Sequence, residues 1–151
     1  MHYKLRPATL EDLPVLLDFE QELIKAERPM DPTIPEDKIS YYSIESFIKD
    51  PDIAVRVVEI EGEIVASGYA RPKPDRPYLK HDLFGHLGFM FVKEEHRGKG
   101  LNKLILDELI DWCKAQGLHE IRLDVYATNP SAIRAYEKVG FQQHLIQMRL
   151  V

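Results

Sequence analysis

The sequence predicts a single α/β domain with a mixed, mostly antiparallel central sheet of six to seven strands and helices on both faces. Two observations predict this class. Runs rich in Val, Ile and other apolar residues alternate along the chain with amphipathic stretches of helical period. The chain has 151 residues, of which 44% are hydrophobic, enough for one core but not for two domains. We therefore expect residues 1–151 to form one domain.

The first half of the chain predicts two helices between strands. Tyr3–Pro7 is typical of a short strand, and Thr9 with Asp12 resembles the capping pattern of a helix that extends to about Ala26. A loop with three prolines follows, and residues 36–49 are expected to form a second helix. Two strands joined by Glu61-Gly62 predict a hairpin; they cover residues 53–60 and 63–70.

The segment 71–82 has three prolines and more cations than acids, and it predicts a loop. Two interpretations stay open: a solvated hairpin tip, or an arm that contacts an acidic acceptor. The next run, Leu83–Val92, is apolar but contains Gly85 and Gly88. Glycine inside a strand indicates a bulge or the close approach of another group.

The last third of the chain predicts two more helices. Residues 101–116 form the clearest amphipathic pattern, and Gly117 is a typical helix terminator. A strand at 119–126, a helix at 129–138 and a strand at 144–151 are expected to complete the sheet.

Composition excludes several classes of protein. The net charge of −5 argues against a nucleic-acid binder, which needs a basic face. A single cysteine, Cys113, excludes an internal disulfide. An apolar leader or a membrane-spanning run is not apparent, so we expect a cytoplasmic protein that contacts neither membrane nor nucleic acid, and the residues indicate no metal site.

The segment Arg97 to Asn102 has the sequence R-G-K-G-L-N and joins a predicted strand to a predicted helix. Glycines let a backbone approach an anion, and the first N–H groups of a helix have no partner within it. A phosphorylated ligand is therefore expected here. The nucleotide-binding P-loop pattern is not found, and Lys103 stands where the dinucleotide fingerprint needs glycine or alanine.

The spacing of Arg97 and Gly100 resembles the acyl-coenzyme A pyrophosphate loop of the GNAT N-acetyltransferase superfamily, with Asn102 in place of the usual small residue. Residues that match the second signature of this family follow at the expected spacing: Asn129, Ala132, Tyr136, Gly140 and Phe141. The start of the chain is also similar, through Leu5, Arg6, Ala8 and Asp12.

This resemblance implies a fourth and a fifth strand that splay apart, with the pantetheine arm of acetyl-CoA hydrogen-bonded along the fourth. It assigns cofactor binding to Met90, Phe91, Val92, Arg97, Gly98, Lys99, Gly100, Leu101, Asn102, Asn129 and Arg134. In this interpretation Arg97 is the main cation for the pyrophosphate, while Lys99 reaches the 3′-phosphate region. Asn129 either contacts pantetheine or simply caps its helix.

Tyr136 is the proton donor that the resemblance implies for the departing thiolate, because a phenol with a pKa of about 10 can protonate it. Many family members carry a glutamate base on the fourth strand, but this chain has Gly88 there. His86 is on the same face of the strand and is our candidate base. Other sources stay open: Glu20, Glu22, Tyr78 or bulk water.

The sequence thus predicts an acetyl-CoA-dependent N-acetyltransferase acting on a primary amine of a small molecule or peptide. Acidic residues around the expected acceptor elements slightly favour a cationic amine; they are Glu20, Glu22, Asp31, Glu36, Asp37 and Glu45. Two alternatives stay open, a non-catalytic acyl-CoA-binding module and an unrelated phosphate-binding domain. Many proteins of the family form homodimers, although no residue here demonstrates one.

Overall fold

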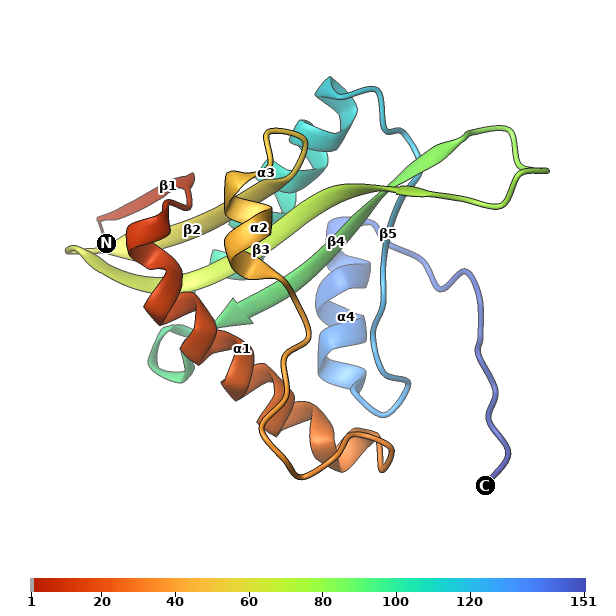
Figure 1. The fold of residues 1–151 in the computed structure, drawn as a ribbon, viewed down its shortest axis with the longest axis horizontal. Helices are drawn as coiled ribbons and strands as arrows, with labels where there is room; N and C mark the ends of the chain where they lie inside the picture. The colour runs from red at the N-terminus through yellow and green to blue at the C-terminus, as the bar shows by residue number, and fades with distance from the viewer. Residues whose placement is uncertain (1) are drawn as a thin grey trace.

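Five strands form one sheet in the order β1-β2-β3-β4-β5 in the computed structural model, which describes residues 2–151 (Figure 1). The strands are β1 Tyr3–Pro7, β2 Ala54–Ile60, β3 Glu63–Pro74, β4 Leu83–Val92 and β5 Ile121–Leu123. The first four pair antiparallel with their neighbours, whereas β4 and β5 are parallel. The mixed, mostly antiparallel sheet is therefore confirmed.

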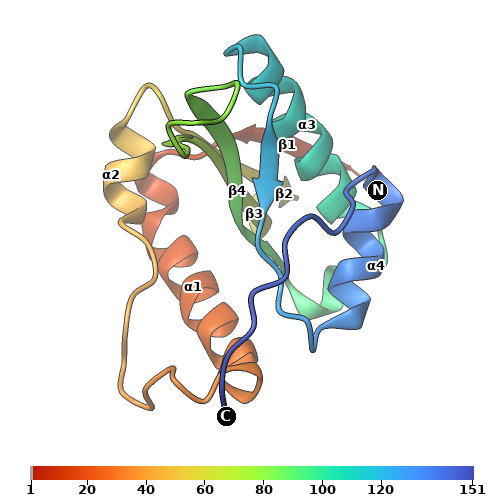
Figure 2. The same ribbon diagram turned by 90° about the vertical axis from the view of Figure 1, so that its right-hand side faces the viewer.

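The prediction of six to seven strands is wrong, because residues 144–151 form no strand in the part of the chain that the structure describes. After its fourth helix the chain runs as an extended tail outside the sheet (Figure 2). The apolar side chains of this tail, including Leu145 and Ile146, are exposed and have no opposing surface. Their alternation alone cannot make a strand, since a strand also needs a partner for its backbone groups.

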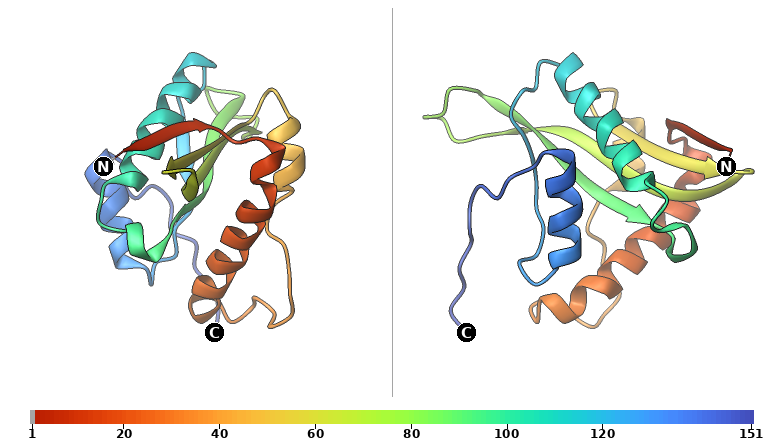
Figure 3. Two further views of the ribbon diagram at one scale, coloured as in Figure 1. Left: turned by 90° about the vertical axis from the view of Figure 1, so that its left-hand side faces the viewer. Right: turned by 180° about the vertical axis from the view of Figure 1, so that it is seen from behind.

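Four helices cover the two faces of the sheet. They are α1 Leu13–Glu27, α2 Ile44–Lys49, α3 Leu101–Ala115 and α4 Pro130–Val139. α1 and α2 lie on one face, and α3 and α4 cross the other, as the views from the side and from behind show (Figures 2 and 3). Each face has its own cluster of buried residues, one centred on Leu16 and Phe19 of α1, the other on Ile105 and Leu109 of α3.

The second helix is shorter than predicted, since α2 begins at Ile44 rather than at residue 36. The preceding loop is instead held by Glu20 of α1, whose side chain is 1% exposed. Its carboxylate accepts hydrogen bonds from the backbone N–H groups of Tyr41 and Tyr42, both at 2.8 Å, and from the hydroxyl of Ser40 at 3.2 Å. A backbone bound in this way is not free to form helical hydrogen bonds.

Strand β3 continues through Pro72 to Pro74, into the segment that was expected to be a loop. β2 pairs with β3 only as far as Ala70, so beyond this residue β3 has β4 as its partner on one side alone. Proline is tolerated in such an edge segment because its missing N–H can face away from the ladder. The loop itself is reduced to residues 75–82, where the N–H of Asp75 bonds to the carbonyl of Asp82 at 2.9 Å.

The described helices include none that is both long enough and apolar enough to cross a membrane.

Replacing Glu20 with alanine leaves the N–H groups of Tyr41 and Tyr42 without their acceptor. We expect Glu20→Ala to lower the free energy of unfolding by about 2–4 kcal/mol, measured by urea denaturation. Glu22→Ala is the matched control, because Glu22 lies exposed on the same helix, and it should change stability by less than about 0.5 kcal/mol. Equal effects of the two substitutions would contradict the anchoring role of Glu20.

Candidate active site

A β-bulge interrupts β4 at Phe89 and Met90. Ser67 pairs with Phe91 and Tyr69 pairs with Gly88, so that two residues of β4 lie opposite the single residue Gly68. Phe89 has a φ of 57°, in the left-handed region that a phenylalanine rarely adopts. The buried hydroxyl of Ser67 donates a hydrogen bond to the carbonyl of Phe89 at 3.0 Å. This bond satisfies a backbone acceptor that the bulge removes from the ladder.

Side chains pack closely against the backbone around the bulge. A Cβ on Gly68 would lie 2.7 Å from the sulfur of Met90 and 2.8 Å from a methyl carbon of Ile105, so any larger residue would push the bulge or α3 aside. Gly85 is equally close to the sulfur of Cys113, at 2.7 Å. Gly85 and Gly88, the two glycines that the sequence analysis singled out, both mark close approaches of side chains, and the bulge begins directly after Gly88.

β4 and β5 stop pairing just before the bulge. They pair only over Gly85–Leu87 and Ile121–Leu123, although β4 continues to Val92. From Gly88 onward β4 therefore has no strand on its β5 side within residues 2–151. Met90, Phe91 and Val92 lie along this free edge. This loss of pairing is what the expected splay of the fourth and fifth strands requires.

The segment after β4 forms an open, glycine-containing turn at the N-terminus of α3. Gly98 and Gly100 have φ values of 78° and 81°, and Gly100 is the N-cap of the helix. The helix has no side-chain cap, so the first N–H groups of Leu101, Asn102 and Lys103 are not covered by a capping side chain. A 15-residue helix with an uncapped N-terminus attracts anions through its N–H groups and its dipole.

Two predicted phosphate ligands, Arg97 and Lys99, are exposed on this turn. Arg97 donates from Nε to the carbonyl of Val92 at 3.1 Å, which ties the turn to the end of β4 and leaves the two terminal nitrogens of the guanidinium for other partners. The ammonium of Lys99 lies 3.2 Å from Nδ1 of His96.

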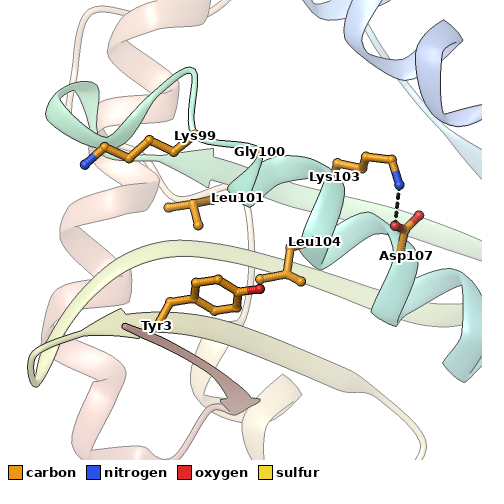
Figure 4. Close-up of a pocket in the computed structure, with 7 residues that line it drawn as sticks. All are labelled: Tyr3, Lys99, Gly100, Leu101, Lys103, Leu104 and Asp107. Carbon is orange, nitrogen blue, oxygen red and sulfur yellow. Dashed lines mark hydrogen bonds and ion pairs between the residues drawn. The ribbon is translucent and has the colours of Figure 1, made fainter. Parts of the chain in front are cut away.

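A hollow of about 190 Å³ also touches this turn (Figure 4). It is lined by Tyr3, Lys99, Gly100, Leu101, Lys103, Leu104 and Asp107. Tyr3 belongs to β1, at the edge of the sheet opposite to β5. The ion pair between Lys103 and Asp107, at 2.7 Å, closes one side. The hollow therefore lies away from the divergence of β4 and β5.

The second sequence signature forms α4 and its ends. The side chain of Asn129 accepts a hydrogen bond from the N–H of Ala132 at 3.3 Å, so Asn129 does cap the helix, as one of its two interpretations expected. Tyr136 is half-buried and stacks edge-to-face with Phe141, ring centroids 6.2 Å apart. Burial, followed by the charge of Glu27, raises the pKa of Tyr136 and keeps its phenol protonated. Arg134 is exposed on the same helix.

His86 lies on β4 facing the α1–α2 side of the sheet, with its ring centroid 5.9 Å from that of Tyr69. Burial lowers the pKa of His86 to about 4, helped by the positive charges of Lys73 and Arg71 and opposed by Asp124. The imidazole is therefore neutral at physiological pH. Residues 2–151 contain no group of three or more His, Cys, Asp or Glu side chains placed to hold a metal ion.

Comparison with known proteins agrees with this geometry. The profile of the Acetyltransferase (GNAT) family matches residues 17–141. The chain belongs to this family. It is 31% identical over 109 residues to a glucosamine 6-phosphate N-acetyltransferase of Arabidopsis thaliana, a match that covers 72% of this chain and 70% of that protein.

Two further GNAT comparisons extend over nearly the whole chain. An N-alpha-acetyltransferase of Sulfurisphaera tokodaii is 27% identical over 148 residues, covering 93% of this chain and 81% of that protein. The crystal structure of a predicted acetyltransferase from Clostridium acetobutylicum with acetyl-CoA has a TM-score of 0.79 and 21% identity, covering 99% of this chain and 96% of that one. Acetyl-CoA is the donor that the GNAT family uses, and this protein of the same fold was solved with it.

Tyr69 occupies the space beside Gly88. A Cβ on Gly88 would lie 2.6 Å from both the hydroxyl oxygen and the ring carbon that carries it in Tyr69. The phenol therefore fills the space into which a side chain at position 88 would project. Burial is the main cause that raises the pKa of Tyr69 to about 12, so its hydroxyl is protonated and can donate or accept hydrogen bonds beside His86.

Two of the other candidate bases of the sequence analysis, Glu20 and Tyr78, are hydrogen-bonded within the chain. Glu20 is saturated by the backbone of the loop before α2. Tyr78 is 74% exposed at the tip of the β3–β4 hairpin, where its hydroxyl accepts a hydrogen bond from Arg76 at 3.1 Å.

Asp31, one of the acidic residues expected near the acceptor, accepts a hydrogen bond from the hydroxyl of Tyr126 at 2.9 Å and forms an ion pair with Arg149 at 3.1 Å. Two of the six acidic residues that favoured a cationic amine, Glu20 and Asp31, are thus bound within the chain.

Sequence reasoning missed several residues that shape this site. Ser67 and Phe89 define the bulge, yet a serine in an apolar strand and a phenylalanine at positive φ carry no recognisable pattern. Tyr69 was overlooked because its contact with Gly88 spans two strands. Gly68 was the one available signal, since an isolated glycine inside a strand indicates close approach.

A side chain at position 88 should compete with Tyr69 for space. We expect Gly88→Ala to lower the free energy of unfolding by about 1–3 kcal/mol. In the Tyr69→Ala background the same substitution should cost close to nothing, because its new methyl group then enters empty space. A double-mutant cycle measured by urea denaturation tests this. The same cost in both backgrounds would show that the ring does not occupy this space.

The low pKa of His86 predicts a pH-dependent stability. The folded protein binds a proton at His86 only below about pH 4, whereas the unfolded chain binds it below about pH 6.5. Stability from this group is complete above pH 6.5 and is lost as the pH falls toward 4, by on the order of 1–2 kcal/mol between pH 7 and pH 5. His86→Phe should flatten this part of the stability profile, while the exposed control His119→Gln should leave it unchanged.

Proposed function

We propose that this GNAT protein transfers the acetyl group of acetyl-CoA to a primary amine of a small molecule or peptide by direct attack. The observation that carries the proposal is the bulge of β4, which lies where β4 and β5 separate and leads directly into the uncapped N-terminus of α3. An exposed strand edge suits the amide groups of pantetheine, and a positive turn suits a pyrophosphate.

The chain's residues have distinct roles in binding. Met90 to Val92 offer backbone groups along the free edge of β4. The N–H groups from Gly98 to Asn102 bind the pyrophosphate, with Arg97 as the cation tied to the end of β4. Lys99 and Arg134 supply further charge for the phosphates. Asn129, whose oxygen caps α4, has its amide N–H₂ left for the cofactor.

Acetyl-CoA supplies a thioester, whose carbonyl carbon bonds to the acceptor nitrogen as the carbon–sulfur bond breaks. Backbone N–H groups at the bulge, from Phe89 to Phe91, bind the carbonyl oxygen as it becomes negative. Tyr136 donates its hydroxyl proton to the departing sulfur. The ammonium proton leaves through water toward solvent, and the neutral His86 relays it rather than holding it, because its low pKa disfavours the imidazolium.

The acceptor class follows only broadly from the relatives. One relative is named for the amine of a sugar phosphate, glucosamine 6-phosphate, and another for an α-amino group. Both kinds of amine belong in the first acceptor screen, as glucosamine 6-phosphate and as a short peptide with a free N-terminus.

Acetyl-CoA at ~100 times its dissociation constant should add ~2.7 kcal/mol to stability and raise the melting temperature by several degrees. Tyr136→Phe should keep this rise but lower kcat at least ~100-fold, since only the proton donor is lost. Tyr78→Phe at the exposed hairpin tip is the control and should change neither. A missing rise with the wild-type protein would sink the proposal; a rise without turnover, unaffected by Tyr136→Phe, would support a non-catalytic acyl-CoA-binding module.

A further inference from the structure

Arg71 is a half-buried arginine that forms no ion pair among residues 2–151. Its Nε is buried and has no hydrogen-bond partner anywhere in residues 2–151. Three other partly buried arginines form ion pairs: Arg6 with Asp12 at 2.8 Å, Arg56 with Glu108 at 3.0 Å and Arg122 with Asp75 at 2.7 Å. A guanidinium that loses water without gaining a partner costs stability, so an external partner has to be considered.

The guanidinium of Arg71 lies on the face of the sheet that α1 and α2 cover. Its guanidinium carbon lies 4.9 Å from the ring centroid of Phe47 on α2, and the residue pairs with His86 across β3 and β4. Lys73 follows two residues later, on the same face. The positive charges of Lys73 and Arg71 both help to lower the pKa of His86, whereas Asp124 raises it. Two cations therefore face one acid here.

We propose that Arg71, assisted by Lys73, binds an anionic group of the acceptor, so that the acceptor is an amine that also carries a phosphate or a carboxylate. This inference rests on the proposed acetyltransferase function and specifies its substrate class. It replaces the preference for a cationic amine, because Arg71 and Lys73 place positive charge on this face while Glu20 and Asp31 are already bound within the chain. A guanidinium fits both oxyanions through two parallel hydrogen bonds.

The position of Arg71 along the sheet sets the size of this acceptor. Arg71 pairs with His86, and His86 comes three residues before Phe89 at the bulge. At 3.3 Å per residue this is about 10 Å along β4. An amine that reaches the carbonyl carbon at the bulge and an anion held at Arg71 are therefore separated by several bonds, as in a phosphorylated amino sugar or a dipeptide.

The test uses pairs of amines that differ only in the anionic group: glucosamine 6-phosphate with glucosamine, and glycylglycine with its C-terminal amide. We measure kcat/KM for each, and separately the melting temperature of the protein with coenzyme A and each amine. Arg71→Met removes the charge but keeps an apolar stem over Phe47. Arg76→Met is the matched control, since Arg76 is an arginine of the same hairpin, at its exposed tip.

The wild-type protein should prefer the charged member of at least one pair by tenfold or more in kcat/KM, and that member should also raise the melting temperature more. Arg71→Met should remove both differences while leaving the shift caused by acetyl-CoA unchanged, and Arg76→Met should keep them. Preference within the sugar pair identifies phosphate, and preference within the peptide pair identifies carboxylate.

Two results would overturn the inference. One is a wild-type protein that neither prefers nor is stabilised by the charged member of either pair; the other is a preference that survives in Arg71→Met. Both leave the acetyltransferase proposal intact, since that proposal fails when acetyl-CoA does not stabilise the protein or when no amine is acetylated, and neither outcome depends on Arg71.

Discussion

The hydrogen bond from Ser67 to the carbonyl of Phe89 holds the feature on which the rest of the site depends. It lets β4 carry one residue more than β3, and the strand changes direction there. β5 can then pair with β4 before the bulge but not after it. A free strand edge at one end of the sheet and a turn that leads into α3 both follow from this local change in register.

The sheet separates the elements proposed to bind the cofactor from the face that carries the candidate base. The turn before α3 and the signature helix α4 lie with one hydrophobic cluster, and the face that carries Tyr69 and His86 lies with the other. Helix α1 orders the face that carries Tyr69 and His86, because its residue Glu20 fixes the loop that carries Tyr41 and Tyr42. Tyr42 in turn contacts Tyr69, ring centroids 5.4 Å apart. A carboxylate buried in a helix thus positions the aromatic wall beside β4.

Patterns local in the sequence predicted most of this fold. The amphipathic periods gave α1 and α3, the interior glycines of β4 indicated the close approaches, and the spacing of Arg97 and Gly100 indicated the turn. The misses are effects of distant contacts. α2 is shorter than predicted because Glu20 binds the backbone that was expected to form its first turns. Residues 144–151 have the alternation of a strand but no neighbouring strand to pair with. Likewise, Tyr69 beside Gly88 and the unpaired Arg71 are visible only once β3 and β4 are aligned.

Cys113 has a consequence for how this protein can be handled in the laboratory. Its thiol is fully buried against Gly85, and burial raises its pKa to about 11. Thiolates, not thiols, react with disulfide reagents, so the folded protein should be silent toward them. Free coenzyme A released during turnover can then be counted with a colorimetric thiol reagent against no protein background. A cysteine introduced on the surface would likewise be the single labelling position of the chain.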